Sequence, residues 1–258
     1  RILAAFDYSL AIHKDLKRAS GEPYISHPLA IVDILLDLGL DADSLAAALL
    51  HDVLGTTAAC LPENSPPDAP LTQAVTPEEL ENRFGPDLRR LVESITKIAD
   101  LQARNKSIQE AESIRKMLFA MVEDLRVILI KLADKLHNMR TLQYLDENTR
   151  KATAQECIDI YAPLADRLGI SWMKDELEDL ALKHLNREVY DQIKNIVALK
   201  KAERQDVLEK TRKAILSEAK AAGFTVEVKV RAKHFWSIYQ KMRKRNKGAE
   251  DLFDLGLV

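Results

Sequence analysis

The sequence is poor in aromatic residues, glycine and cysteine. Aromatic residues make up 5% of its 258 residues, and it contains only 8 glycines and 2 cysteines. This scarcity, together with abundant Ala, Leu, Glu and Lys, favours helices over sheets. The thiols of Cys60 and Cys157 lie far apart in the chain, which argues against a disulfide scaffold and is typical of a reducing compartment. We therefore expect a mainly α protein of the cytoplasm.

A strong net charge and long apolar runs are also missing. The formal net charge is −2, so the chain has no global basic field of the kind that attracts nucleic acids. No apolar run approaches the roughly 20 residues of a membrane-spanning helix, and no signal-like leader opens the chain. We expect no membrane partner. The chain starts at Arg1 and stops inside an apolar pattern, so we expect a fragment of a longer protein.

Helical periodicity dominates the chain up to Gly223. Asp43 or Ser44 is the expected amino-terminal cap of the third helix. The segment 125–145 is apolar around most of its circumference, which predicts a central buried helix. A Pro-rich loop at 56–77 is long enough to be a functional segment. The predicted helices cover residues 1–19, 27–39, 41–55, 77–85, 86–101, 107–124, 125–145, 147–170, 172–186 and 187–221.

The pattern changes after Gly223. Residues 224–231, "FTVEVKVR", alternate apolar and polar side chains, which predicts a strand, and a basic helix follows at 234–247. The predicted organisation is a helical domain at 1–186, a linking helical region at 187–222 and the truncated beginning of an α/β or α+β domain at 223–258.

Polar residues interrupt two segments that otherwise look buried. In "AAALLHDVLGTT", His51 and Asp52 end a run of small apolar residues. Taken alone, this dipeptide is more typical of a hydrogen-bonded structural pair than of a site. Asp134 in "IKLADKLHNM" lies among apolar residues at helical spacing and is expected to point inward, where a carboxylate needs a cation. With His27, these residues would supply two imidazoles and two carboxylates, which suits manganese, iron or zinc.

Several longer strings resemble a known family. "KRASGEPYISHPLAIV", "LLHDVL", "IKLADKLHNMRTL" and "IYAPLADRLGI" are similar, in order and spacing, to the amino-terminal half of the long Rel/SpoT family. These proteins are bifunctional synthetases and hydrolases of the alarmone (p)ppGpp, and their hydrolase is a helical bundle of the HD superfamily. "VRAKHFWSIYQKMRK" resembles the opening of the family's nucleotidyltransferase-like synthetase domain.

The resemblance implies a reaction and a site. Manganese would be held at the positions of His27, His51, Asp52 and Asp134, and pyrophosphate would be removed from the 3′ position of ppGpp or pppGpp, giving GDP or GTP. The guanosine pocket is implied to contain the following residues: Arg18, Ser20, Asn138 and Thr141.

The chain departs from the family where the water-activating acidic pair is expected. The family motif continues after His-Asp with two residues and then Glu-Asp, but this sequence reads "HDVLGTT", which places Gly55 and Thr56 there. Neither residue is an effective general base at neutral pH. Glu63 and Asp68 in the following loop are possible substitutes, and an altered sequence at 55–56 is a further alternative. We expect weakened hydrolysis.

The carboxy-terminal segment is basic, which suits phosphoryl transfer. By resemblance, the ATP-contacting synthetase positions are Arg231, Lys233, Ser237 and Lys241. Asp254 matches the magnesium-binding aspartate of the family's synthetase. The rest of that magnesium site lies beyond the chain, so we expect no alarmone synthesis from this chain. Ribosome and tRNA contacts of the family likewise belong to regions outside this sequence.

The alternative function is a catalytically inactive guanine-nucleotide-binding regulatory domain that controls the synthetase. A purely structural domain without ligands is a third interpretation.

Overall fold

A computed structural model of the chain describes residues 1–54, 75–103, 124–228, 231–232, 234–245 and 256–257. Its contacts divide it into two compact units. Unit 1 comprises Arg1–Arg150 with Asp159–Tyr161, and unit 2 comprises Lys151–Ile158 with Ala162–Val258. The predicted boundary after residue 186 lies within unit 2. Because a compact unit is not necessarily a functional domain, the three-part organisation stays a prediction.

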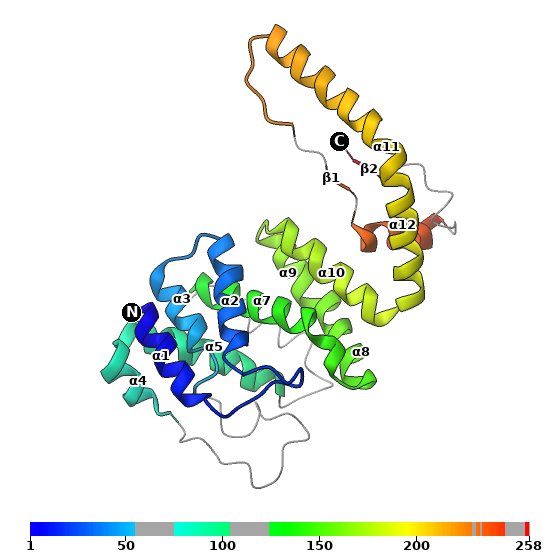
Figure 1. The fold of residues 1–258 in the computed structure, drawn as a ribbon. Helices are drawn as coiled ribbons and strands as arrows, with labels where there is room; N and C mark the ends of the chain where they lie inside the picture. Colours follow the sequence, from blue (N-terminus) through cyan, green and yellow to red (C-terminus); the bar gives the residue numbers. More distant parts are fainter. Residues whose placement is uncertain (55–74, 104–123, 229–230, 233, 246–255, 258) are drawn as a thin grey trace. The chain divides into compact units, whose positions relative to one another are not determined.

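Unit 1 is a bundle of helices, shown from blue to green in Figure 1. Helix α2 packs against α3 and α7, and α3 also packs against α1 and α5. The elements of this unit are α1 (Ile2–Ile12), α2 (Ser26–Asp37), α3 (Ala42–Leu49), α4 (Pro77–Phe84), α5 (Pro86–Ala103), α7 (Leu125–Arg140) and the 3-10 turn η1 (Leu142–Tyr144).

Unit 2 is built around α10, which packs against α9, α11 and α12. A small apolar core of Leu182, Ile193 and Ile238 joins α10, α11 and α12. Two short strands, β1 (Arg231–Ala232) and β2 (Gly256–Leu257), pair antiparallel. The helices are α9 (Ala162–Arg167), α10 (Ser171–Leu185), α11 (Arg187–Ala221) and α12 (Phe235–Arg245), while α8 (Glu147–Glu156) and the π-helical turn η2 (Cys157–Tyr161) contain residues of both units.

The mainly α fold predicted from composition is confirmed. Helix α7 buries residues on most of its circumference, as its apolar pattern predicts, and α11 has the predicted bounds. Asp124 caps α7, because its carboxylate accepts a hydrogen bond from the backbone N–H of Arg126 at 2.9 Å. None of the helices in the described part of the chain is both long and apolar enough to cross a membrane.

Several local predictions differ from the structure. The helix predicted at 125–145 ends at Arg140, and the 3-10 turn η1 follows it. Helix α1 ends at Ile12 rather than at residue 19, because the chain turns back through a β-bridge between Lys17 and Pro23. Gly21 permits this turn with a φ of 86°. Helix α3 ends at Leu49 rather than near Gly55, and its amino-terminal cap is Asp41, which accepts from the N–H of Ser44.

The predicted strand at 224–231 is also wrong for most of its described part. Residues 224–228 form no regular structure, whereas Arg231 at the end of the predicted span lies in β1. Phe224 and Val226 are exposed by 69% and 42%, so these two apolar residues do not face a core. The predicted helix at 107–124 and the loop at 56–77 lie almost entirely outside the described residues.

Candidate metal centre

His51 lies in the turn that follows α3 and not on the helix itself. Its Nδ1 is 2.9 Å from the carbonyl oxygen of Ala48, one of the carbonyls that the helix end leaves without an intrahelical partner. This hydrogen bond requires a proton on Nδ1 and therefore leaves the lone pair on Nε2. The helix end thus fixes both the position and the tautomer of a buried imidazole.

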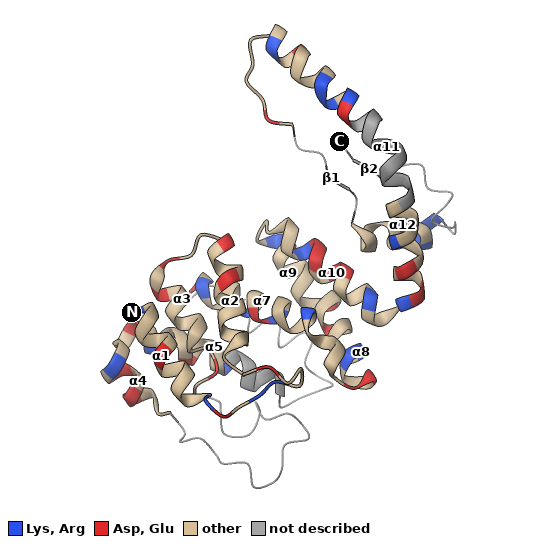
Figure 2. Cartoon of the chain, in the orientation of Figure 1, with Lys and Arg blue, Asp and Glu red and all other residues tan. Residues whose placement is uncertain are grey.

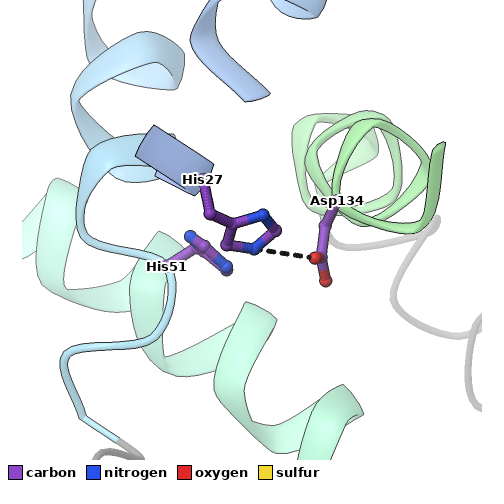
Figure 3. A group of neighbouring side chains, drawn as sticks. All are labelled: His27, His51 and Asp134. Carbon is purple, nitrogen blue, oxygen red and sulfur yellow. Dashed lines mark ion pairs between the residues drawn. The ribbon is translucent and has the colours of Figure 1, made fainter. Parts of the chain in front are cut away.

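His27 is the second residue of α2 and is also buried, with 4% of its surface exposed. Its Nε2 is 3.3 Å from Oδ1 of Asp134 on α7, and its ring meets that of His51 edge-on at 5.2 Å. Figure 3 shows the two rings on one side of the Asp134 carboxylate. Packing of α2 against both α3 and α7 brings these three side chains together.

Asp134 is held by polar side chains of its own helix. Oδ2 is 2.9 Å from the buried ammonium group of Lys131, and Oδ1 accepts a hydrogen bond of 2.8 Å from the amide of Asn138. Burial disfavours the charged carboxylate, but Lys131 and His27 hold the pKa of Asp134 well below its usual range. Burial likewise opposes the charge of Lys131, yet Asp134 raises its pKa. Both groups are therefore charged at neutral pH.

The donor atoms of His27, His51 and Asp134 all lie within 4.8 Å of one another. Two imidazole nitrogens and one carboxylate oxygen form a donor set that suits a divalent transition metal. The lone pair left on Nε2 of His51 fits such an ion. The predicted inward orientation of Asp134 is therefore found, and the group is a candidate metal centre.

Asp52 is buried but does not belong to this group of three. Its Oδ1 is 3.9 Å from Nδ1 of His51 and 3.6 Å from Nε2 of His13. Burial opposes its charge, while His51 and His13 keep its pKa below the usual value. Asp52 is thus an ionised carboxylate beside the group, and its role as a fourth ligand stays a prediction.

Sequence reasoning missed His13 and His137 as neighbours of the centre. His13 is buried, stacks on Tyr24 at 4.6 Å and faces Asp52. His137 lies one turn beyond Asp134 on α7, and its Nδ1 is 2.7 Å from Nδ1 of His27. Burial, together with the nearby charges of His27 and Arg18, lowers the pKa of His137 to about 4. His137 is therefore neutral at pH 7.

Three of the four residues implied in guanosine binding are in contact. Arg18 donates hydrogen bonds to Asn138 at 3.3 Å and to Thr141 at 3.1 Å. Burial lowers the pKa of this guanidinium, which nevertheless remains charged at neutral pH. Because Asn138 also bonds Asp134, this polar group continues from the candidate metal centre. Ser20 instead donates to Glu22 at 3.3 Å.

The predicted synthetase residues are only partly described. Ser237 and Lys241 lie on α12, whose Lys and Arg residues are blue in Figure 2. The hydroxyl of Ser237 is 3.0 Å from Nε2 of His234. Arg231 contributes backbone to β1. The side chain of Arg231 lies outside the described residues, as do Lys233 and Asp254, and so do Gly55 and Thr56.

A second group of metal-ligand residue types lies in unit 2. Nε2 of His234 is 2.7 Å from a carboxylate oxygen of Glu178, and its Nδ1 is 3.2 Å from one of Asp175. Asp179 accepts a hydrogen bond from the backbone N–H of Trp236. Both ring nitrogens face carboxylates, so we interpret this group as a polar bridge that joins α10 to the start of α12.

Comparison with known proteins agrees with the geometry in unit 1. The family model described as "HD domain" matches residues 5–171, which include all three residues of the candidate centre. The chain belongs to the HD domain family. HD domains are metal-dependent hydrolases, and the His27, His51 and Asp134 group of this HD protein could hold the metal.

Curated relatives of this HD protein are longer than the chain. It is 41% identical over 253 residues to a guanosine-3′,5′-bis(diphosphate) 3′-pyrophosphohydrolase of Borreliella burgdorferi, covering 98% of the chain and 36% of the relative. It is 38% identical to the GTP pyrophosphokinase rsh of Brucella melitensis, covering 97% and 31%, respectively. Identity to a 3′-pyrophosphohydrolase of Haemophilus influenzae is also 38%, covering 94% and 34%. The chain spans about a third of the length of these relatives.

Proposed function

We propose that this HD protein is the metal-dependent 3′-pyrophosphohydrolase part of a bifunctional enzyme of (p)ppGpp metabolism. The observation that carries the proposal is the convergence of His27, His51 and Asp134 in a chain similar to ppGpp 3′-pyrophosphohydrolases along nearly its whole length. Its substrates are then ppGpp and pppGpp, and its products are pyrophosphate with GDP or GTP. The proposed location is the cytoplasm.

The proposed metal is Mn²⁺, held by His27, His51 and Asp134 with Asp52 as the fourth ligand. The mixed imidazole and carboxylate donors support an ion of intermediate softness. A divalent cation at such a site supplies Lewis acidity, which neutralises charge on the attacked phosphate and makes a water molecule more acidic.

Substrate binding is assigned to the polar group beside the centre. Arg18 offers a buried positive charge, and the amide of Asn138 and the hydroxyl of Thr141 offer donors and acceptors for a guanine or ribose. Ser20 completes the proposed pocket. Since Asn138 bonds Asp134, a nucleotide that engages this group would keep its phosphates close to the centre.

Hydrolysis is proposed to be weak because Gly55 and Thr56 replace the acidic pair of the family. Neither residue can take a proton from water at neutral pH, and a positioned general base typically contributes about 10²–10⁴ in rate. The test compares the unaltered chain with the double variant Gly55→Glu, Thr56→Asp in Mn²⁺ and ppGpp, following pyrophosphate release. We expect the double variant to be faster by about 10²–10⁴. Equal and measurable rates for the two proteins would contradict weakened hydrolysis. If neither protein releases pyrophosphate, the result would contradict the hydrolase assignment.

A second candidate function is a nucleotide-binding regulatory domain that controls the synthetase. The contacts of Arg18 with Asn138 and Thr141 support nucleotide binding, while Gly55 and Thr56 in place of the acidic pair oppose hydrolysis, and together they favour this function. Calorimetry with ppGpp separates the two functions, because a regulatory domain binds the nucleotide tightly without turnover. The Arg18→Ala variant is the control and should lose this binding.

The longer protein to which the chain is proposed to belong is a GTP pyrophosphokinase as well. The name of the Brucella melitensis relative supports this proposal. ATP would be contacted by Arg231, Lys233, Ser237 and Lys241, and Mg²⁺ by Asp254. Ribosome and tRNA contacts are proposed for parts of that protein outside this sequence.

A further inference from the structure

The imidazoles of His27 and His137 share an unusually direct contact. The two Nδ1 atoms are 2.7 Å apart, and the ring centroids are 5.0 Å apart with planes tilted by 38°. Two ring nitrogens at this distance need one proton between them, because two lone pairs or two N–H groups would repel each other. The contact therefore couples the tautomer of His27 to that of His137.

The position of His27 shows why this coupling matters. Its Nε2 faces Asp134 at 3.3 Å and lies in the candidate metal centre. Nε2 can bind a metal only through its lone pair, so the ring proton must then occupy Nδ1. A proton on Nδ1 needs an acceptor, and the acceptor at hydrogen-bond distance is Nδ1 of His137.

The second imidazole of the centre has a different partner. Nδ1 of His51 bonds the backbone carbonyl of Ala48, which can only accept a proton. A carbonyl therefore fixes His51 in one tautomer. An imidazole nitrogen, in contrast, can either donate or accept a hydrogen bond. Nδ1 of His137 can therefore donate to His27 when Nε2–H of His27 faces Asp134, and accept from Nδ1–H of His27 when Nε2 carries the lone pair.

We propose that His137 is a positioning residue of the metal centre, which accepts the Nδ1–H of His27 and so presents the lone pair of Nε2 to the cation. This inference rests on the proposed function because it requires a bound divalent ion. His137 does not itself join the donor group of His27, His51 and Asp134. Hydrogen-bond partners of metal-bound histidines orient the ring, and their removal typically weakens metal binding about 10–100-fold.

The test measures Mn²⁺ affinity of the whole chain by calorimetry in three variants. His137→Leu keeps bulk but removes the acceptor, and we expect binding weaker by about 10–100-fold. His137→Asn retains an oxygen that can accept at the position of Nδ1, and we expect affinity within about threefold of the unaltered chain, since one hydrogen bond is preserved. His184→Leu in α10, a histidine of unit 2, is the matched control and should bind like the unaltered chain.

Each outcome decides the inference. Unchanged affinity of the Leu variant would overturn it, and so would an Asn variant as weak as the Leu variant, because bulk or direct coordination would then explain the loss. Circular dichroism checks folding, and His137→Ala replaces the Leu variant if that protein is unfolded. Failure of the unaltered chain to bind Mn²⁺ would instead contradict the proposed metal-dependent function, and the positioning role would fall with it.

Discussion

The centre of unit 1 contains charged side chains that are costly to bury. Lys131 and Asp134 are 7% and 9% exposed and form an ion pair of 2.9 Å. Removing one partner of such a pair leaves an uncompensated charge, whereas the pair itself adds little net stability. The pair is therefore better explained by its effect on the site, because Lys131 keeps Asp134 ionised and oriented toward His27.

The cap of α7 gives a pH-dependent prediction at a single residue. Asp124 accepts hydrogen bonds from Arg126, which hold the pKa of Asp124 below its usual value. A carboxyl group whose pKa is lower in the folded than in the unfolded protein stabilises the folded state. This contribution is fully present above about pH 4, the pKa in the unfolded protein, and is lost as the pH falls through the pKa in the folded protein. We expect Asp124→Asn to cost about 1 kcal/mol at pH 7, since asparagine still caps but has no charge, and progressively less below about pH 4.

Urea unfolding of both proteins across this pH range measures the effect of Asp124→Asn. The exposed Asp33 on α2 supplies the matched control, and Asp33→Asn should change the unfolding free energy by less than about 0.5 kcal/mol. A cost for Asp124→Asn that stays constant from pH 7 to pH 3 would show that the charge of Asp124 does not contribute.

Individual site residues differed in how far the sequence could predict them. The sequence predicts His27, His51 and Asp134 as site residues because each interrupts a local apolar pattern or accompanies a motif. His13 lies in a segment whose local pattern carries no such signal, whereas His137 lies in the same string as Asp134, "IKLADKLHNM", which does not show what His137 contacts. Their partners, Asp52 and His27, are distant in sequence, so only tertiary packing identifies them.

At the scale of elements, α3 explains why small residues precede His51. Ala46, Ala47 and Ala48 are fully buried although successive helical residues point about 100° apart. Several faces of α3 are therefore covered, by α1, α2, α5 and α7. Small side chains let these helices approach closely enough to bring His27 and Asp134 to the turn that carries His51.

A larger side chain at the middle alanine should disturb this packing. We expect Ala47→Leu to destabilise the protein by about 1–3 kcal/mol, because a fully buried position has no space for three additional carbons. Ala42→Leu on the exposed first turn of α3 is the control and should change stability by less than about 0.5 kcal/mol. Urea unfolding at pH 7 measures both. Equal effects of the two variants would mean that α3 is not tightly packed.

The helices were more predictable than their ends. Long periodic segments such as 187–221 carry many independent signals and were placed correctly. The end of a helix depends on one or two hydrogen bonds, so neighbouring residues with similar side chains are hard to tell apart as caps. Asp41 caps α3, although Asp43 and Ser44 have equally suitable side chains. The strand predicted at 224–231 is absent at residues 224–228, because alternation indicates a strand only where a partner sheet covers one face.

At the scale of the whole molecule, the candidate ligands all belong to unit 1. His27, His51 and Asp134 come from α2, the turn after α3, and α7, while α11 and α12 belong to unit 2. A bound ion links three segments that must separate when unit 1 opens. An ion that binds only the closed state stabilises it by mass action, by about 2.7 kcal/mol at 100 times its dissociation constant.

Hydrogen exchange therefore should report metal binding in one unit. At saturating Mn²⁺ we expect amides of α2, α3 and α7 to exchange up to about 100-fold more slowly, because their opening must now release the ion. Amides of α11 and α12 should change less than about twofold, since these helices supply no ligand to the group. In the Asp134→Asn variant the protection should disappear, because an amide is a poorer ligand than a carboxylate for such an ion. Equal protection of both units would show instead that the chain opens as one cooperative body, and protection that survives in the Asn variant would place the ion elsewhere.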